Sequence, residues 1–463
     1  MTAPSDRVAA PGVAFAAALL FAISLAIFWP GYVAFDSLAQ HAQAIDGRYD
    51  DWHPPVMARL WSLFARHGPA PMLALQLGTY WSGLGLLAAA LASRGRGRAA
   101  CAMLAIGVWP PLLGWQAVVL KDMQMSGALL GAVGVVGWWR LRERRLPWPA
   151  LALVAILMGY ALLVRANAPF AVMPLIAMLL PWPHGRARAG VAVGGIVLAL
   201  LLAPLLNHRL MQAQRSGVER TQAMYDLSGI GVASGDPAVG LSTATLAAMR
   251  AKRCVRPYFW DPLGEPQRCE ALVAPWQATA AGTLYIRLAG MILRHPLSYA
   301  THRLAHLNST ERLWVPLHWI GAAPPQASEP NRRGFAEPAA AAARWQGLAA
   351  WLIESPLGWP SVWVVAAIAG LLRSRRGPAE DRLPAALFTS ALAIEVSFAA
   401  ISIASDLRYH LWTLAATAVG WVLIGPRRWP RAATLALVGV IAIGALARAT
   451  LPQAPQSYAG MLG

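Results

Sequence analysis

GVAFAAALLFAISLAIFWPG, residues 12–31, is an apolar run long enough to cross a lipid bilayer as one helix. Similar runs recur along the 463-residue chain, which is 57% hydrophobic and only 13% charged. Soluble domains carry about 25% charged residues, so the composition predicts an all-α polytopic membrane protein. About eleven transmembrane helices are expected, at 12–31, 70–93, 99–119, 123–139, 148–164, 168–183, 189–206, 356–372, 383–404, 409–425 and 432–449.

The charge distribution predicts the orientation of these spans. The formal charge of +18 comes from 39 basic and 21 acidic residues, and only Lys121 and Lys252 of the basic residues are lysines. Most arginines lie between the apolar runs, as topology signals do, which argues against nucleic-acid binding. With the N-terminus in the cytoplasm, every even-numbered connection is arginine-rich: 94–98, 140–145, 186–188, 373–382 and 427–431. The alanine- and arginine-rich composition is typical of bacteria, so we expect a multi-pass inner-membrane protein with periplasmic long loops.

Two connections on the predicted outer side are long, 32–69 and 207–355. They divide the chain into an N-terminal transmembrane module, 1–206, an outer-face soluble region, 207–355, and a C-terminal transmembrane module, 356–463. Within the soluble region, 283–313 is expected to form one or two amphipathic helices around His295-Pro296. Cys254 and Cys269 in this region could be joined by a disulfide or remain free thiols, and their spacing leaves both open.

The first outer loop concentrates acidic residues. Its sequence AFDSLAQHAQAIDGRYDDWHPP, 34–55, contains Asp36, Asp46, Asp50 and Asp51. Asp36 lies about five residues beyond the first span, where a carboxylate is costly to desolvate and therefore indicates function. The alternative is that Asp36 caps a helix. Asp46, beside a glycine, is typical of a turn.

A short helix is expected to follow this loop. Proline suits the first turn of a helix, so the Pro54-Pro55 pair after His53 predicts a helix over 55–66. Its apolar face would hold Val56, Leu60, Leu63 and Phe64. A helix of this kind lies at the membrane interface and would fix the acidic loop near the bilayer surface.

Three short turns on the same predicted side also carry polar groups. They lie between spans three and four, five and six, and nine and ten. The residues that we expect to border one outer-surface site with Asp36 are Asp50, Asp51, His53, Lys121, Asp122, Arg165, Asn167, Arg408, Tyr409 and His410.

These residue types together suit one kind of chemistry. A carboxylate can act as general base for an acceptor hydroxyl or amine, and cations stabilise an anionic leaving group such as a phosphate. Lysine supplies a point charge, whereas arginine is a fork that matches phosphate oxygens. A divalent metal could bridge carboxylates and phosphate. Transfer of a sugar from a lipid-linked phosphate needs this combination.

Three features resemble the GT-C superfamily of integral-membrane glycosyltransferases, in particular the protein mannosyltransferase and aminoarabinose transferase group. They are Asp36 soon after the first span, the helix opened by His53-Pro54-Pro55, and Lys121-Asp122 in the second outer turn. The motifs cover roughly residues 10–170, and the rest is similar only in layout. The resemblance implies transfer of a sugar from a polyprenyl-phosphate donor to a lipid, glycan or protein acceptor at the outer face.

By the same resemblance, Asp36 would be the catalytic base, and Lys121, Asp122 and Arg165 would be donor-site residues. In the glycosyl transfer that we expect, Lys121, Arg165 and Arg408 would hold the donor phosphate. A divalent cation, Mg or Mn, would be a cofactor, with Asp122 and His53 as candidate ligands. The sequence departs from the family at Phe35-Asp36-Ser37, which has a lone acid where many members have a pair. The missing partner could be Asp50, Asp51 or Asp122.

A transporter or flippase of lipid-linked saccharides, or an outer-face glycan ligase, is the alternative. Transporters carry charges along the bilayer midplane and often have repeated halves. Here the predicted midplane is nearly free of charge apart from Glu395, and no internal repeat is found. This favours surface chemistry. Glu395 itself is either functional or bonded to a neighbouring helix through Ser397 or Ser402, and both readings stay open.

Overall fold

The computed structural model describes residues 10–180, 185–375, 382–425 and 429–462. These residues form helices, turns and three isolated β-bridges, and no strand, which confirms the all-helical class. The bundle helices are α1 (Ala10–Phe28), α4 (Ala70–Ser93), α5 (Gly97–Gly107), α6 (Pro110–Gln116), α7 (Lys121–Arg140), α8 (Trp148–Val164), α9 (Pro169–Leu179), α10 (Gly185–Leu205), α17 (Pro360–Arg375), α18 (Arg382–Ile401), α19 (Leu411–Ile424) and α20 (Arg431–Thr450). The remaining α-helices are α2 (Phe35–Asp46), α3 (Val56–Ser62), α11 (Thr221–Ser234), α12 (Thr243–Ala251), α13 (Glu270–Gln277), α14 (Ala281–Arg294), α15 (Pro296–Glu311), α16 (Ala340–Ile353) and α21 (Tyr458–Leu462).

Each of the eleven apolar runs contains helix, but fewer helices are long enough to cross a membrane. Within the described ranges five qualify by length and hydropathy: α1, α4, α10 with its extension to Leu210, α18 and α20. The α5–α6 pair, bent by 51°, would make a sixth. Helices α8, α9 and α17 are apolar but shorter. The structure therefore supports several membrane-crossing helices, whereas the number eleven stays a prediction.

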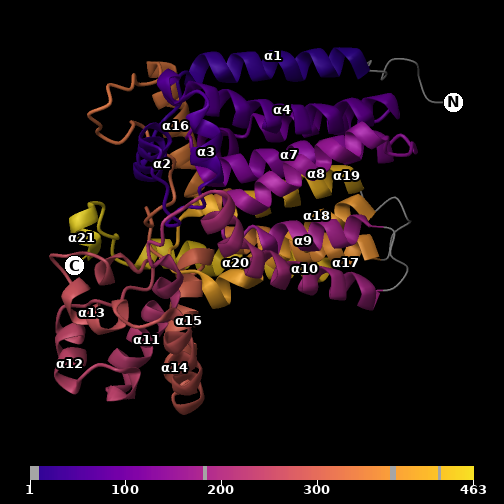
Figure 1. Cartoon of the computed structure of the whole chain (residues 1–463). Coiled ribbons are helices and arrows are strands. Elements are labelled where there is room, and N and C mark those ends of the chain that lie inside the picture. Colours follow the sequence, from indigo (N-terminus) through magenta and orange to yellow (C-terminus); the bar gives the residue numbers. More distant parts are fainter. Residues whose placement is uncertain (1–9, 181–184, 376–381, 426–428, 463) are drawn as a thin grey trace.

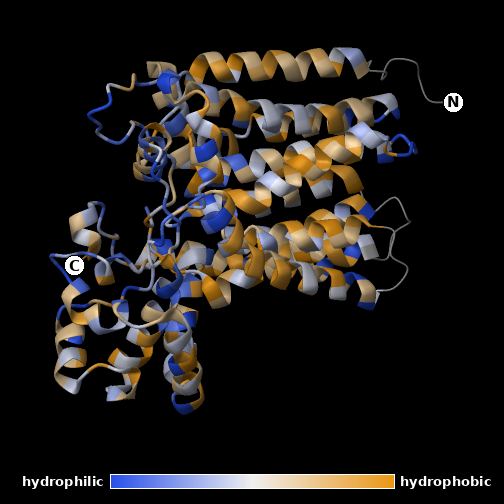
Figure 2. Cartoon of the chain, in the orientation of Figure 1, coloured by the Kyte–Doolittle hydropathy of each residue, from blue (hydrophilic) through white to orange (hydrophobic). Residues whose placement is uncertain are grey.

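Apolar side chains on the outside of the bundle are compatible with lipid around it. Helix α10 buries none of its residues, although it is strongly apolar. Phe15 of α1 and Leu435 of α20 are 71% and 73% exposed. Apolar surface this extensive marks contact with lipid or a partner in preference to water. Figure 2 shows the hydrophobic residues concentrated along the bundle helices between two more polar ends.

Close approach of α4 and α7 forms the centre of the N-terminal half. A Cβ on Gly83 would lie 2.3 Å from the Leu130 carbonyl oxygen, and one on Gly134 would lie 2.5 Å from the Gly83 Cα. Small residues at such crossings allow two backbones to pack directly, as is common between membrane helices. This crossing holds α7 in place, and α7 begins at Lys121.

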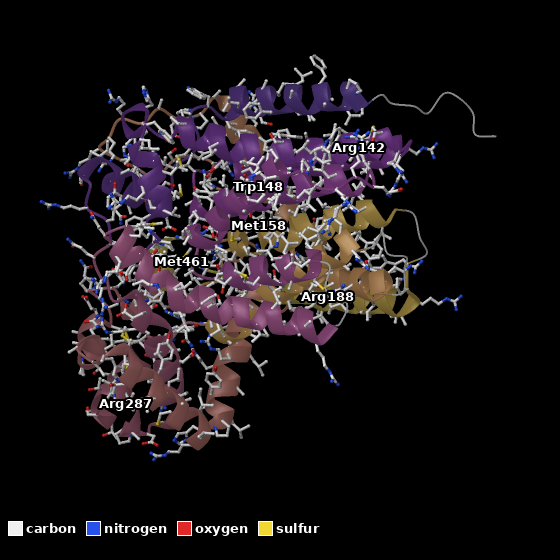
Figure 3. The ribbon with its side chains drawn as sticks, turned by 45° about the vertical axis from the view of Figure 1, so that its right-hand side comes forward. Arg142, Trp148, Met158, Arg188, Arg287 and Met461 are labelled. Atoms are coloured by element: carbon white, nitrogen blue, oxygen red, sulfur yellow. A yellow bond between two sulfur atoms is a disulfide. The ribbon has the colours of Figure 1, made fainter. Side chains whose placement is uncertain are left out.

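The connections separate to opposite ends of the bundle (Figure 1). The start of α1, the connection between α7 and α8, the C-terminal ends of α9, α17 and α19 and the start of α10 lie at one end, which we call the arginine end. Helices α2, α3, α11–α16 and α21 lie at the other, which we call the loop end. Figure 3 shows Arg142 and Arg188 at the arginine end and Arg287 at the loop end. Arg376, Arg427, Arg428 and part of the run 168–183 lie outside the described residues. The pattern agrees with the alternation of arginine-rich connections.

The helices α11 to α14 share a hydrophobic cluster of their own, centred on fully buried side chains such as Tyr225 and Trp276. A disulfide joins Cys254 to Cys269 within it, which decides the question that their spacing left open. Helices α14 and α15 meet at His295, as the pattern over 283–313 predicts.

The helix expected over 55–66 is shorter than the sequence predicts. Helix α3 ends at Ser62, and the chain continues into the 3₁₀ helix η2 (Ala65–His67). Val56, Leu60 and Phe64 pack against the hydrophobic core, as the pattern predicts, whereas Leu63 is 77% exposed. Met57, Ala58 and Trp61 are fully buried as well, because α3 packs against α2 as well as against the bundle.

Candidate functional site

Backbone hydrogen bonds between the segments that precede α2 and α7 bring Asp36 beside Lys121. The amide of Val119 donates to the carbonyl of Tyr32 at 2.9 Å, and the Ser37 hydroxyl donates to the carbonyl of Val119 at 2.5 Å. Asp36 lies in the first turn of α2, and Lys121 is the first residue of α7. The two helix starts therefore lie next to each other at the loop end, although their residues are far apart in the sequence.

The Asp36 carboxylate is surrounded by basic side chains. Its Oδ2 lies 2.9 Å from Lys121 Nζ and 3.2 Å from Arg408 Nη1, and its Oδ1 lies 3.7 Å from His53 Nε2. Lys121 Nζ also donates to His53 Nδ1 at 2.8 Å. None of these four side chains is more than 17% exposed. We call Asp36, His53, Lys121 and Arg408 the Asp36 cluster.

The protonation states in this cluster follow from burial and charge. Burial by itself raises the pKa of the Asp36 carboxyl, but Lys121, Arg408 and His53 together hold that pKa well below its usual range. Burial, followed by the nearby Lys121 ammonium, lowers the pKa of His53 to about 4. At neutral pH the carboxyl is thus ionised and the imidazole neutral, with its Nδ1 accepting from Lys121 and its Nε2–H facing Asp36.

The 3₁₀ helix η9 (Leu407–His410) positions Arg408. Asp406 Oδ2 accepts from Arg408 Nε at 3.0 Å and lies 2.9 Å from Nη2. The Leu407 amide donates to the Gly321 carbonyl at 2.8 Å. Gly321 has φ +69°, and a Cβ there would lie 2.2 Å from Asp406 Oδ1. Glycine is therefore required at this contact, which aims Arg408 at Asp36.

A second charged pair lies beside the cluster. Arg165 Nη1 donates to Oδ1 of the fully buried Asp122. The Arg165 guanidinium lies 4.2 Å from the Tyr409 ring centroid, and the guanidinium of Arg408, the residue before Tyr409 in η9, lies 5.4 Å from it. Tyr409 thus connects the pair to the Asp36 cluster. Asn167 Oδ1, on the same turn as Arg165, is buried and accepts no hydrogen bond from the described residues.

Asp50 and Asp51 do not join the cluster. Asp50 Oδ1 accepts from the Trp52 amide at 3.0 Å. Asp51 Oδ1 accepts from the Ser216 amide and hydroxyl, each at 2.6 Å, and its Oδ2 lies 3.4 Å from His208 Nε2. The Asp50 backbone also bridges to Gln214, so both residues fasten the first loop to the start of the 207–355 region, and neither is the acidic partner of Asp36 in this structure.

The 207–355 region also contacts the first loop near the site. The Trp52 and Trp260 rings lie 5.5 Å apart, and the Trp260 amide donates to the Ile403 carbonyl at 2.9 Å. These contacts place part of that region beside the Asp36 cluster. The site is therefore bordered by the bundle and by this region.

Asp406 lies in the polar turn between spans nine and ten, which the sequence places beside the site, and the structure shows that it orients Arg408. Gly321 had no role in the sequence interpretation, because its contact with Asp406 is created only by folding. His410 was expected beside Asp36 but pairs with Glu395, at 2.8 Å from Nδ1 to Oε2. Ser397 and Ser402 bond to nearby backbone carbonyls instead.

Asp122 and His53 do not fit a divalent cation between them. Arg165 bonds to Asp122, Lys121 donates to Nδ1 of His53, and Nε2 of His53 faces Asp36 and not Asp122. With Arg408 also present, three cations surround these ligands, and a further positive charge would be repelled. The basic groups suit an anion at this position.

Comparison with protein-family models, with curated proteins and with solved structures finds no match for this chain. At the loop end of the apolar helices, the basic side chains of Lys121 and Arg408 can bind an anion, and the Asp36 carboxylate beside them can accept a proton.

Proposed function

We propose that this protein is an integral-membrane glycosyltransferase. It transfers a sugar from a polyprenyl-phosphate-linked donor to a lipid, glycan or protein acceptor at the outer face of a bacterial inner membrane. The observation that carries the proposal is the Asp36 cluster, in which a base and two phosphate-binding cations from three separate segments meet at the loop end. The resemblance of residues 10–170 to GT-C enzymes points the same way.

Donor binding would move Lys121 and Arg408 from the Asp36 carboxylate to the donor phosphate. In the free protein, Lys121 and Arg408 both bond to its Oδ2. A phosphate that enters the site attracts these cations, with Arg165 next to them, because they match its charge and geometry. The loss of the two cations would raise the pKa of Asp36 towards its usual range. The carboxylate becomes a stronger base only when the donor is present.

The transfer step forms one bond at the anomeric carbon of the donor sugar and breaks another. The acceptor oxygen or nitrogen attacks the anomeric carbon of the donor sugar, and the bond from that carbon to the phosphate oxygen breaks. The electron pair leaves with the polyprenyl phosphate, whose charge Lys121, Arg165 and Arg408 stabilise. The acceptor proton passes to Asp36, acting as general base.

The direct test uses full-length protein in proteoliposomes with radiolabelled polyprenyl-phosphate sugars and a membrane extract as acceptor. Wild type should release polyprenyl phosphate and label the acceptor. We expect Asp36→Asn to lower the transfer rate by roughly 10²–10⁴-fold, the usual contribution of a general base. Asp46→Asn is the matched control, because Asp46 ends the same helix and is exposed.

Transfer by Asp36→Asn at the wild-type rate would remove Asp36 from its role. Movement of intact donor across the vesicle membrane without release of polyprenyl phosphate would instead identify a flippase. Transfer of long polymers but not of single sugars would identify a ligase.

A further inference from the structure

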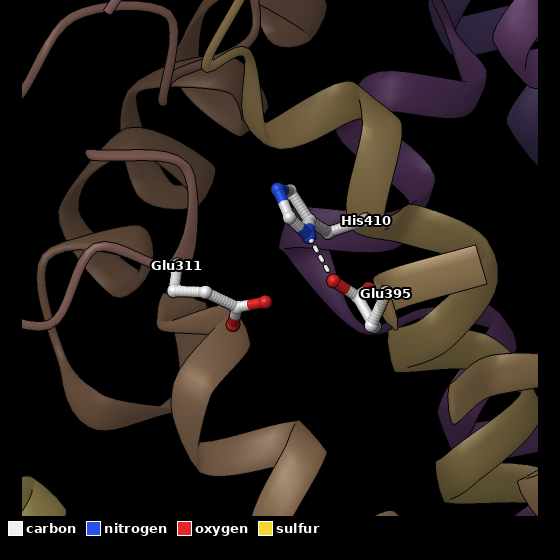
Figure 4. Close-up of side chains that lie close together, drawn as sticks. All are labelled: Glu311, Glu395 and His410. Carbon is white, nitrogen blue, oxygen red and sulfur yellow. Dashed lines mark hydrogen bonds and ion pairs between the residues drawn. The ribbon is translucent and has the colours of Figure 1, made fainter. Parts of the chain in front are cut away.

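A second cluster of ionisable side chains lies where the 207–355 region meets the bundle. Glu311 ends α15, Glu395 lies in α18, and His410 ends η9 (Figure 4). Figure 4 shows the three side chains pointing towards one another. One donor atom from each lies within 4.8 Å of the other two. Glu395 and His410 are buried, at 4% and 0% exposure.

Each of the two carboxylates in this cluster has one oxygen without a hydrogen-bond partner among the described residues. Glu395 Oε1 and Glu311 Oε2 are buried and accept no hydrogen bond from the described residues. The nearby cations already have carboxylate partners, since Arg312 lies 3.5 Å from Glu354 and Arg165 bonds to Asp122. A buried carboxylate without a counter-charge costs several kcal/mol, so this pair must either share a proton or hold a positive charge between its two members.

Glu311 is the most accessible of the three residues, since its side chain is only partly buried where α15 meets the bundle.

His410 is held in an orientation that suits a ligand. Its Nε2 lies 2.9 Å from the Thr310 hydroxyl, and its Nδ1 lies 2.8 Å from Glu395 Oε2. When Nε2–H donates to Thr310, Nδ1 keeps a lone pair directed at the carboxylates. Histidine ligands are commonly oriented through their other nitrogen in this way.

We propose that Glu311, Glu395 and His410 bind one divalent transition-metal ion, Zn²⁺ or Mn²⁺, with water completing its coordination. Two carboxylates and one imidazole suit these ions, whereas Mg²⁺ and Ca²⁺ prefer oxygen ligands alone. Donor atoms around a tetrahedral ion lie roughly 3–4 Å apart when its bonds are about 2.0–2.2 Å, so a small rotation of Glu311 completes the set. The ion would join α15 to α18 and to η9, two residues from Arg408. The site stands independently of the proposed glycosyl transfer.

The test measures metal binding and stability, not activity. Full-length protein in detergent is stripped with a chelator and titrated with Zn²⁺ or Mn²⁺, and bound metal is counted by mass spectrometry. We expect about one ion per wild-type chain and a higher unfolding temperature. Glu395→Gln and His410→Gln should each weaken binding by more than the roughly 10–100-fold that loss of an outer partner costs. Glu219→Gln, at an exposed glutamate, is the control.

Glu395→Gln also removes a buried charge, so it should be more stable than metal-free wild type while gaining nothing from added metal. Substitution of Co²⁺ should give visible absorption bands that the variant lacks. If Glu395→Gln does not fold, Glu311→Gln at the partly accessible position gives the same readout. Wild type that binds no metal, or Glu395→Gln that binds it with wild-type affinity, overturns the site and leaves two carboxylates that share a proton.

Discussion

Neighbouring basic side chains control the base strength of the Asp36 carboxylate. Two basic side chains offset the cost of burying its charge, and the same contacts lower its pKa. A carboxyl with such a low pKa is a weak base. Under the proposed function, the donor phosphate removes these cations, so that base strength depends on the presence of substrate.

Asp261 gives a pH-dependent prediction. Burial and the neighbouring Asp406 raise the pKa of Asp261 to about 6. The folded state therefore holds this proton more tightly than the unfolded chain, whose carboxyl has a pKa near 3.8. The resulting stability is fully present below about pH 4 and is lost as the pH rises through about 6. We expect Asp261→Asn, which cannot ionise, to be more stable than wild type at pH 8.

Thermal unfolding in detergent between pH 4 and pH 8 checks this. The difference in unfolding temperature between Asp261→Asn and wild type should grow as the pH rises through about 6. A difference that is equal at both ends of the range would mean that Asp261 does not titrate near pH 6.

At the scale of elements, the contact of Gly321 with Asp406 and Leu407, at the start of η9, sets the direction of the Arg408 side chain. An alanine at Gly321 must adopt a left-handed conformation, which costs about 1–2 kcal/mol, and its Cβ would also collide with Asp406. We expect Gly321→Ala to lower the unfolding temperature and to reduce glycosyl transfer by displacing Arg408.

Gly334→Ala is the matched control for this prediction. Gly334 has nearly the same φ, +68°, and its Cβ would meet nothing within 4 Å. Both variants share the backbone cost, so only Gly321→Ala should lose transfer. Equal losses in the two variants would show that the contact with Asp406 does not position Arg408.

At the scale of the whole molecule, the two ends of the bundle should face different compartments. In a Cys101→Ser background, we expect a membrane-impermeant maleimide to label Arg332→Cys in intact cells. Arg145→Cys should react only after permeabilisation, because arginine-rich connections stay in the cytoplasm. Both positions are exposed, and the native Cys254 and Cys269 are joined in a disulfide. Labelling of Arg145→Cys in intact cells would show that the arginine end faces the periplasm, opposite to the predicted orientation.

The sequence by itself determined the helical class, the apolar runs and the separation of arginines from the long loops. These are local properties, because the length and hydropathy of a segment decide whether it can form a membrane-compatible helix. The sequence also singled out Asp36, Lys121 and Arg408, since charges beside apolar runs are rare and costly.

Only the tertiary structure decided which of these charges meet. Helix neighbours are set by packing such as the Gly83–Gly134 crossing, and hydropathy does not encode them. Packing therefore placed Lys121 and Arg408 on Asp36 and directed Asp51 to Ser216. It also set the buried face of α3 and brought together the cluster of Glu311, Glu395 and His410, because each contact joins segments distant in the chain.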